Sequence, residues 1–452
     1  MLDIVILAAG KGTRMRSSKP KVLHTLAGKP FVSHVIDRSH EMKADAIKVV
    51  IGHGAEQVEQ QLAAPGIEFV EQTEQLGTGH AVQQVLPLLH AQATILILYG
   101  DVPLIKTKTL EELVAKVSDS SMGLLTIELE DPMGYGRIVR ENGEVVAIVE
   151  QKDATDEQLN IAEINTGVMA VKGQHLLEWL PALSNDNAQG EYYLTDIIAM
   201  ARNSGISVQT TQPESEGEVM GVNNRMQQAE LERIYQREIA EQLMVEGVTL
   251  LDPARFDCRG SLTVGSDCVV DVNCVFEGKV TLGNNVHIGP NCMLKDTTVG
   301  DNTQIHANSV LEDSELEASC NIGPYARLRP GSKLAEGAKI GNFVETKKAV
   351  IGKGSKVNHL SYVGDAELGE GVNVGAGTIT CNYDGVNKHK TSIGDGVFVG
   401  SNTALVAPVS MAKGTTIAAG SIVTRNSKEN ELVVARSRQQ NLPGWKRPTK
   451  KS

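Results

Sequence analysis

The sequence predicts an α/β domain, one long linking helix and a parallel β-helix, in that order. The first 222 residues alternate short apolar runs with amphipathic segments. Residues 226–247 have the apolar spacing of a single helix, and from about residue 264 the chain repeats every six residues. Helices have a period of about 3.6 residues and strands a period of about two, so a period of six marks a third kind of structure.

Apolar runs of strand length recur through the first region, and amphipathic segments separate them. Strands that alternate with helices imply crossover connections and a mainly parallel sheet. Ligands of such sheets bind beyond the carboxyl ends of the strands. The helix candidates include Phe31–Glu41 and Gly79–Leu86. The strand candidates are Ile4–Leu7, Ile47–Ile51, Ile95–Tyr99, Gly123–Ile127 and Val168–Val171.

The linking segment MQQAELERIYQREIAEQLMVEG contains no proline and no internal glycine. Its apolar residues recur at helical spacing, and the final Gly247 suits a helix C-terminus. We therefore place the domain boundaries at residues 1–225, 226–246 and 247–452.

Six-residue units such as VGSDCV, LGNNVH, VGSNTA and IAAGSI fill most of residues 264–425. An aliphatic residue opens each unit, and a small residue is common at its fifth place. This pattern fits short strands joined by flat turns, with the opening aliphatic side chains stacked inside a β-helix. The repeat breaks at Thr380–Lys390, which we expect to be an inserted loop, and the chain ends in a basic, irregular tail.

The composition excludes several classes of protein. With 452 residues and a net charge of −12, the chain is long enough for two or three domains and too acidic for general nucleic-acid binding. The opening MLDIVIL lacks the cationic start of a secretory signal, and no apolar run reaches the length of a membrane span. None of the six cysteines forms a CxxC pair. We expect a reduced, cytoplasmic protein without membrane or nucleic-acid partners.

A glycine-rich loop, LAAGKGTRM at residues 7–15, follows the first strand candidate. Backbone N–H groups of such loops can bind phosphate. The loop is not a Walker A motif, and it is not a dinucleotide-binding fingerprint because Met15 stands where the third glycine would be. Since tight turns need glycine in any case, the loop alone is a weak signal.

Further segments make the pattern specific. They are KPK at 19–21, Gln72 with QLGTG at 75–79, YGD at 99–101, YGR at 135–137, VEQK at 149–152 and NTG at 165–167. In this order they resemble the nucleotidyltransferases that join a nucleoside triphosphate to a sugar 1-phosphate, and they cover the N-terminal half. The resemblance implies that a sugar-phosphate oxygen attacks the α-phosphorus and pyrophosphate leaves. Positioning and charge neutralisation then supply most of the catalysis.

The same resemblance implies a role for each matched residue. Arg14 and Lys21 would be catalytic by neutralising the phosphates. Asp101 and Asn223 would hold Mg2+, which prefers oxygen ligands. The full nucleotide- and sugar-binding set is Leu7, Ala8, Ala9, Gly10, Lys21, Gln72, Gly77, Thr78, Tyr99, Gly100, Asp101, Gly136, Glu150, Asn165 and Asn223.

Within that set the uracil edge would be read by Gln72 and the Gly77–Thr78 backbone. The sugar would be held by Gly136, Glu150 and Asn165. Four residues of the set also have an ordinary structural interpretation when taken alone.

In that interpretation Asp101 caps a helix, Asn223 caps the linking helix, Lys21 is a solvated loop charge and Glu150 is an exposed strand residue. The ordered series of motifs favours the functional interpretation.

The C-terminal half contains residues that depart from the six-residue pattern. Acetyl transfer from a thioester to an amine needs a base, and His359 suits that role near neutral pH. A backbone N–H of Gly375–Gly377 would face the thioester oxygen. Arg329 and Lys347 suit an anionic acceptor such as a sugar phosphate. Alternatively, His359 is a structural histidine, the two cations are surface charges and the tail is a solvated terminus.

Together with the N-terminal motifs, these residues resemble a family of bacterial bifunctional enzymes, the N-acetylglucosamine-1-phosphate uridyltransferase/glucosamine-1-phosphate acetyltransferases. The resemblance spans essentially the full chain. It implies a left-handed β-helix and a homotrimer with acetyltransferase sites between subunits. It also implies Mg2+ as cofactor, acetyl-CoA and UTP as co-substrates, and a product, UDP-N-acetylglucosamine, used for peptidoglycan and lipopolysaccharide.

For the acetyltransferase the resemblance implies His359 as the base. The acceptor would be bound by Arg329, Lys347, Tyr362 and Asn373. Acetyl-CoA would be bound by Ala376, Asn382, Tyr383, Ser401, Ala419 and Arg436.

Two other functions fit parts of the pattern. One is a single-activity nucleotidyltransferase whose β-helix serves assembly or regulation, as in the ADP-glucose pyrophosphorylases. The other is a non-enzymatic scaffold, like the exchange-factor subunits of eukaryotic translation initiation. The C-terminal residues disfavour the first, and the intact set Gly10, Arg14, Lys21 and Asp101 disfavours the second.

Overall fold

The computed structural model describes residues 1–450 of the chain. Contacts divide the chain into two compact units, the first ending at Tyr235 and the second beginning at Gln236. This division falls inside the linking helix α9 (Arg225–Val245), which ends two residues before the expected Gly247. Across the described residues, no helix has both the length and the apolarity needed to cross a bilayer.

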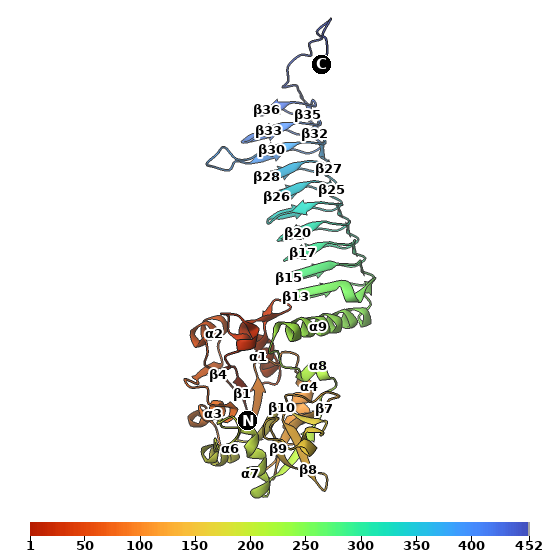
Figure 1. The fold of residues 1–452 in the computed structure, drawn as a ribbon. Helices are drawn as coiled ribbons and strands as arrows, with labels where there is room; N and C mark the ends of the chain where they lie inside the picture. Colours follow the sequence, from red (N-terminus) through yellow and green to blue (C-terminus); the bar gives the residue numbers. More distant parts are fainter. Residues whose placement is uncertain (451–452) are drawn as a thin grey trace. The chain divides into compact units, whose positions relative to one another are not determined.

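The first unit is built on one sheet with the strand order β11-β7-β10-β6-β1-β4-β5 (Figure 1). Strands β1, β4, β5 and β6 pair in parallel, as do β7 and β11, whereas β10 is antiparallel to both of its neighbours β6 and β7. The expected mainly parallel sheet therefore contains one reversed strand. The bounds are β1 Leu2–Leu7, β4 Ala46–Ile51, β5 Ile67–Glu71, β6 Thr94–Tyr99, β7 Ser121–Glu128, β10 Glu163–Lys172 and β11 Ser207–Thr211.

Helices cover both faces of this sheet, because the strands are apolar on both sides. On one face Ile4 and Ile6 of β1 join a core with α1, α2 and α4, and on the other Val5 and Leu7 join a core with α3, α6 and α7. The helix bounds are α1 Phe31–Glu41, α2 Ala55–Leu62, α3 Thr78–Gln83, α4 Thr107–Val114, α6 Gly173–Trp179 and α7 Ile197–Asn203.

One expected helix is shorter than the sequence pattern indicated. We expected a helix over Gly79–Leu86, but α3 ends at Gln83 and a 3-10 turn follows at Leu86–Leu88. Pro87 explains the early end, since it has no N–H to donate to the Gln83 carbonyl four residues earlier and its ring crowds that carbonyl.

The carboxyl ends of β1, β5 and β6 bring the N-terminal motifs together. Leu7 pairs with Tyr99 at the ends of β1 and β6, and the Gly100 N–H donates to the Leu7 carbonyl over 2.9 Å. The glycine-rich loop therefore lies beside the loop that begins with Asp101.

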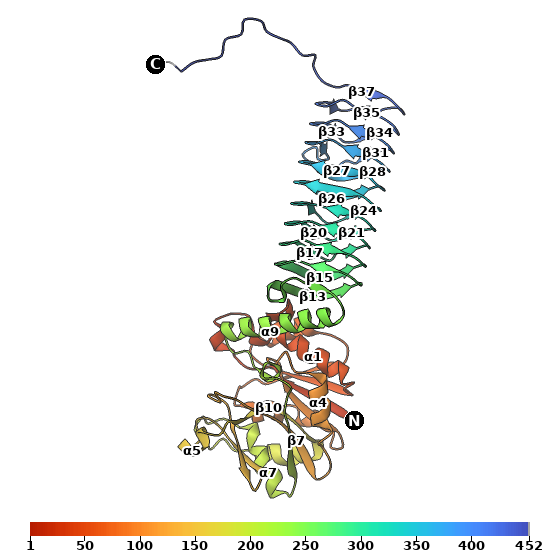
Figure 2. The same ribbon diagram turned by 90° about the vertical axis from the view of Figure 1, so that its right-hand side faces the viewer.

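The second unit is a β-helix of short parallel strands (Figure 2). Its first strand, β12 (Thr249–Leu250), already pairs with β14 (Val269–Val270), so the coils begin earlier than the expected residue 264. The sequence of this first coil lacks the six-residue pattern, which is why the pattern missed it. Successive coils stack one buried aliphatic column: Val270, Ile288, Ile305, Ile322, Ile340, Val357, Val374, Val399 and Ile417.

The expected insertion is a loop between β30 (Ile379–Cys381) and β31 (Thr391–Ile393), and it projects away from the coils in Figure 1. The last strand, β37, is Leu432–Val433, and residues after it form no helix or strand up to residue 450. Five of the six cysteines are buried and all six are free thiols.

Candidate active sites

A cavity of about 260 Å³ lies at the carboxyl edge of the sheet in the first unit. Ten of the fifteen predicted nucleotide- and sugar-binding residues line it: Leu7, Ala8, Ala9, Gly10, Lys21, Gln72, Gly77, Thr78, Tyr99 and Asp101. The order of the strands, and not the order of the sequence, gathers these residues. The cavity is also lined by Glu191, which the sequence motifs did not indicate.

A second cavity of about 240 Å³ shares Tyr99 and Asp101 with the first. Arg14 and Asn223 also line it. The two cavities therefore meet at Asp101. Such an arrangement allows two ligands to approach each other on either side of that carboxylate.

Lys21 lies between the two residues predicted to hold a metal. Its Nζ forms an ion pair with Asp101 Oδ2 and donates to Asn223 Oδ1 over 3.3 Å. The side chains of Lys21 and Asp101 are only 15% and 13% exposed, so Lys21 is not a solvated loop charge. Both oxygens face one position, and that position is occupied by a cationic group.

The structure does not support the capping roles considered for two of these residues. Helix α4 begins at Thr107, six residues after Asp101. The linking helix is capped by Asn224, whose Oδ1 accepts from the N–H groups of Met226 and Gln227 over 2.9 and 3.0 Å. The carboxyl and amide groups of Asp101 and Asn223 are therefore available for another role.

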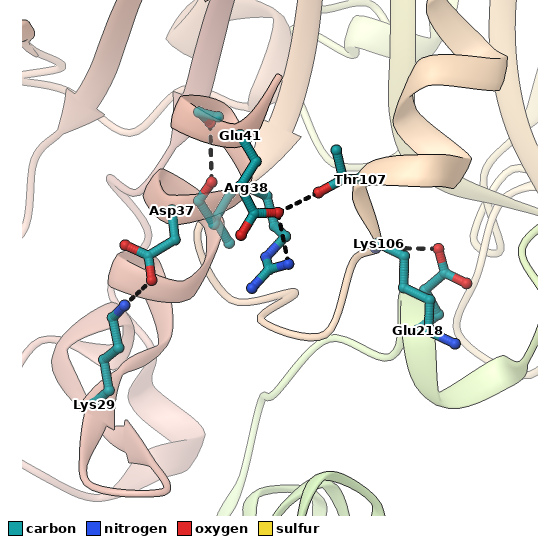
Figure 3. Close-up of polar contacts among 9 residues, drawn as sticks. Lys29, Asp37, Arg38, Glu41, Lys106, Thr107 and Glu218 are labelled. Carbon is teal, nitrogen blue, oxygen red and sulfur yellow. Dashed lines mark hydrogen bonds and ion pairs between the residues drawn. The ribbon is translucent and has the colours of Figure 1, made fainter. Parts of the chain in front are cut away.

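One buried carboxylate, Glu218, and one exposed carboxylate, Glu41, bond to the start of α4 (Figure 3). Glu218 is 2% exposed and accepts from the Lys106 N–H over 3.2 Å, which connects the segment before Asn223 to the start of α4. Glu41 of α1 accepts from the Thr107 hydroxyl over 2.6 Å at the same helix start. Sequence motifs did not indicate these residues, because nothing local marks a carboxylate that bonds across the fold.

The predicted sugar-binding residues lie beside Tyr99. The Asn165 N–H donates to the Gly136 carbonyl over 2.9 Å, and Glu150 accepts from the Thr195 hydroxyl over 3.1 Å. Burial raises the pKa of Glu150, which is therefore not the exposed strand residue of the alternative interpretation. Gly100, Gly136, Glu150 and Asn165 do not line either cavity as the chain stands.

In the second unit His359 is exposed at the end of β27 (Lys356–His359). Its Nδ1 lies 2.7 Å from Oδ1 of Asn342, at the end of β25 (Lys339–Asn342) on the preceding coil. An amide oxygen only accepts, so with Asn342 in this orientation Nδ1 carries the proton and Nε2 keeps its lone pair. This tautomer makes Nε2 available as a base.

Three cations gather on the neighbouring face. The Arg329 N–H bonds to the Thr346 carbonyl, which places Arg329 next to Lys347 on adjacent coils. The inserted loop adds Lys388, and the closeness first of Lys388 and then of Arg329 lowers the pKa of Lys347. Arg329 is also paired with Glu345 over 2.8 Å, so the mutual repulsion falls mainly on Lys347 and Lys388. Repelling cations held close together favour an anionic ligand. Tyr362 lies near Arg329, and Lys388 was not predicted from the sequence.

Several of the residues predicted to meet acetyl-CoA form a column with His359. The strand registers, continued by two residues, place His359, Ala376, Ser401 and Ala419 at the same point of four successive coils. Arg436 of the tail joins the column, because its guanidinium donates to the Ala419 carbonyl over 2.6 Å.

The N–H groups of Gly375 and Gly377 donate to the carbonyls of Val399 and His359. The Ala376 N–H is the one in this run with no hydrogen bond to the described residues. It is therefore the donor that remains for a ligand oxygen.

The remaining predicted residues lie nearby on the same coils. Asn373 begins β29 (Asn373–Val374) and pairs with Lys356. Asn382 is buried and its Nδ2 donates to Asp365 Oδ2, whereas Tyr383 is exposed on the inserted loop.

Comparisons with known proteins agree with both halves. Residues 4–185 match the MobA-like NTP transferase domain, residues 258–342 the GMPPB C-terminal domain, and residues 390–425 the hexapeptide repeat of succinyl-transferase.

Three full-length relatives carry one name, bifunctional protein GlmU. They come from Saccharophagus degradans (72% identity, 100% of both chains), Cellvibrio japonicus (64%, 100% of both) and Marinobacter nauticus (62%, 99% of both). At this identity and coverage, the chain belongs to the bifunctional GlmU family of transferases, with a uridyltransferase and an acetyltransferase activity.

Proposed function

We propose that the N-terminal cavities bind UTP and N-acetylglucosamine 1-phosphate on opposite sides of Asp101. The observation that best supports this is the pair of cavities sharing Asp101 and Tyr99. UTP would lie in the cavity lined by Gln72 and the glycine-rich loop, and the sugar phosphate in the cavity lined by Arg14. The acceptor phosphate oxygen then approaches the α-phosphorus from the side opposite the leaving pyrophosphate.

The position between Asp101 and Asn223, which the Lys21 ammonium now occupies, is suited to Mg2+. Both ligands are oxygens, and the ion pair of Asp101 with the Lys21 ammonium indicates that they converge on a positive charge. Bound there, the ion would neutralise phosphate charge as it develops. Lys21 then moves to the phosphates, and Arg14 binds the acceptor phosphate.

For the acetyltransferase we propose that His359 takes a proton from the amine of glucosamine 1-phosphate. The nitrogen attacks the thioester carbonyl of acetyl-CoA, the N–C bond forms and the C–S bond breaks, and the released thiolate takes the proton from the imidazolium. Asn342 keeps Nε2 as the base, and the Ala376 N–H donates to the developing oxyanion. Arg329, Lys347 and Lys388 bind the acceptor phosphate.

We propose that neighbouring copies of the chain complete the acetyltransferase site. Tyr325, Phe343 and Leu360 occupy one corner of three successive coils and are 52%, 56% and 63% exposed. All three have positive φ, which is rare for bulky residues and holds their side chains outward. Leu360 directly follows His359 in the sequence. Neighbouring chains that pack against this corner would therefore also cover the His359 imidazole. We propose a homotrimer, working in the cytoplasm where both co-substrates and free thiols are expected.

One assay tests both halves. Purified protein is supplied with glucosamine 1-phosphate, acetyl-CoA, UTP and Mg2+, and free thiol and pyrophosphate are measured separately. We expect both products, with pyrophosphate dependent on prior acetylation. Pyrophosphate from supplied N-acetylglucosamine 1-phosphate without any thiol release would refute the role of His359.

A further inference from the structure

Gln72 lines the nucleotide cavity, and its side-chain amide has one polar atom to offer a ligand. The residue is 3% exposed. Its Nε2 donates to the Gly77 carbonyl over 3.1 Å and lies 3.1 Å from Nδ1 of His80. Among the described residues, Oε1 has no hydrogen bond and is not fully buried. Oε1 therefore faces the cavity.

His80 lies between two glutamines. Its Nδ1 faces Gln72, and its Nε2 lies 3.1 Å from Nε2 of Gln84, which also donates to the His80 carbonyl over 2.9 Å. Both ring nitrogens thus face an amide NH2 group. A neutral imidazole has one N–H and one lone pair, so it can accept from only one of them. One glutamine amide must turn its oxygen toward the ring, and a half-turn of the amide exchanges its NH2 group and its oxygen at the same place.

Burial decides which glutamine turns. If Gln72 turned, its buried side-chain oxygen would face the part-buried Gly77 carbonyl oxygen, which leaves two acceptors opposed. Gln84 is half-buried at the end of α3, so water can replace its bond to the His80 carbonyl. Gln84 therefore turns, its Oε1 accepts from the Nε2–H of His80, and the Nδ1 lone pair accepts from Gln72.

From this geometry we infer that Gln84 and His80 are positioning residues that determine which nucleobase the cavity accepts. Gln84 holds His80 in the Nε2–H tautomer, and His80 in turn holds Gln72 with its oxygen toward the base. An inward oxygen accepts the ring N–H of uracil and repels cytosine, whose corresponding nitrogen carries a lone pair. The inference rests on the proposed placement of UTP in this cavity.

A purely structural role for His80 is the competing interpretation. The His80 ring packs 6.2 Å from that of Tyr192, so its loss could simply loosen the base-binding loop. Such loosening would affect UTP and CTP alike. A reversed amide would instead lower the rate with UTP and raise the rate with CTP. The ratio of the two rates therefore separates the interpretations.

The test replaces Gln84, which does not line the cavity, with a side chain that can only accept hydrogen bonds or with one that can only donate them. In mildly alkaline buffer, Gln84→Glu offers only acceptors and preserves the Nε2–H tautomer, whereas Gln84→Lys can only donate and forces the proton to Nδ1. We expect the ratio of kcat/KM for UTP to that for CTP to stay within about twofold of wild type in Gln84→Glu. We expect it to fall by about tenfold or more in Gln84→Lys.

Matched controls come from the neighbouring residue Gln83, which donates to the Leu180 carbonyl and does not contact His80. Gln83→Glu and Gln83→Lys should lower the unfolding temperature without moving the ratio. Nitrogen NMR of the His80 ring in mildly alkaline buffer should show Nε2–H in wild type and Gln84→Glu, and Nδ1–H in Gln84→Lys.

An unchanged ratio in Gln84→Lys, or an Nδ1–H tautomer in the wild type, overturns the inference. An equal loss of kcat/KM with UTP and with CTP means that His80 serves only to pack against its neighbours. The proposed function fails in a different way, if the wild-type enzyme releases no pyrophosphate from UTP and N-acetylglucosamine 1-phosphate.

Discussion

The two sites of this chain differ in how they exclude water. In the first unit Lys21 and Asp101 are largely buried, because loops from several parallel strands close over the edge of a sheet. In the second unit His359 is exposed, because the inward positions of a β-helix are filled by aliphatic side chains. A sheet edge can enclose a ligand within one chain, whereas a β-helix can only present residues on its outer surface. The comparison predicts one site that is complete in the monomer and one that needs other copies.

The largest expected effect is on the enclosed site. Asp101→Ala removes the carboxylate that pairs with Lys21 and is proposed to hold Mg2+, so uridylyl transfer should fall by about a thousandfold or more. Thiol release should remain within about twofold, since the acetyltransferase residues lie in the other unit. Pyrophosphate and thiol assays on one preparation measure both. Asp119→Ala, which changes an exposed carboxylate, is the control. Loss of both activities in Asp101→Ala would show that the sites are not independent.

The matching change at the exposed site is His359→Ala. Removing the proposed base should slow acetyl transfer by about a hundredfold to ten-thousandfold and leave uridylyl transfer unchanged. His287→Ala removes another exposed histidine from the same ladder of strands and should have no effect. Acetylation at the wild-type rate in the His359 variant would make the histidine structural.

The proposal that the acetyltransferase site needs neighbouring copies is tested at the exposed corner formed by Tyr325, Phe343 and Leu360. Phe343→Asp places a charge between chains, so the assembly should dissociate and acetyl transfer should fall by about a hundredfold at low protein concentration. Uridylyl transfer should persist. Leu251→Asp changes an exposed apolar residue outside this corner and should leave the assembly intact. Sedimentation measures the assembly, and a dissociated variant that still acetylates would contradict the comparison.

A smaller effect is expected at the partner of the base. Asn342→Leu removes the acceptor that holds the His359 tautomer and should slow acetyl transfer about tenfold. Asn342→Asp keeps an acceptor and should retain most of the activity. If the two variants behaved alike, the hydrogen bond would have no part in catalysis.

The smallest effect concerns the burial of Glu150. Burial raises its pKa above the ordinary 4.5, so the native state keeps the proton to higher pH than the unfolded chain does. The free energy of unfolding therefore falls as pH rises from about 4.5 through the raised pKa. Glu150→Gln should raise the unfolding temperature near neutral pH, with no gain below that window. Glu144→Gln, at the exposed first position of strand β9 (Glu144–Val149), which ends just before Glu150, should show no such difference.

Local sequence patterns identified most of the helices and strands, but they did not give every first and last residue correctly. Helix α1 has the expected bounds because its apolar spacing starts and stops cleanly, and the β-helix was recognised from the six-residue period. The first coil at Thr249–Leu250 lies inside the expected domain of residues 247–452, but the repeat did not reveal it because this coil lacks that period. Helix α3 ends at Gln83, earlier than expected, because Pro87 follows. Asn223 and Asn224 are adjacent residues of the same type, so the sequence could not indicate that Asn224 caps the helix.

The sequence by itself determined the two architectures, the N-terminal motif residues and the candidate base, because each depends on periodicity or on residues close together in the chain. Tertiary structure alone decided the pairing of Lys21 with Asp101 and Asn223, the tautomer of His359 set by Asn342, and the contribution of Lys388 to the cation cluster. Those contacts join residues from different strands or coils. Their geometry depends on strand order and register, which no local pattern specifies.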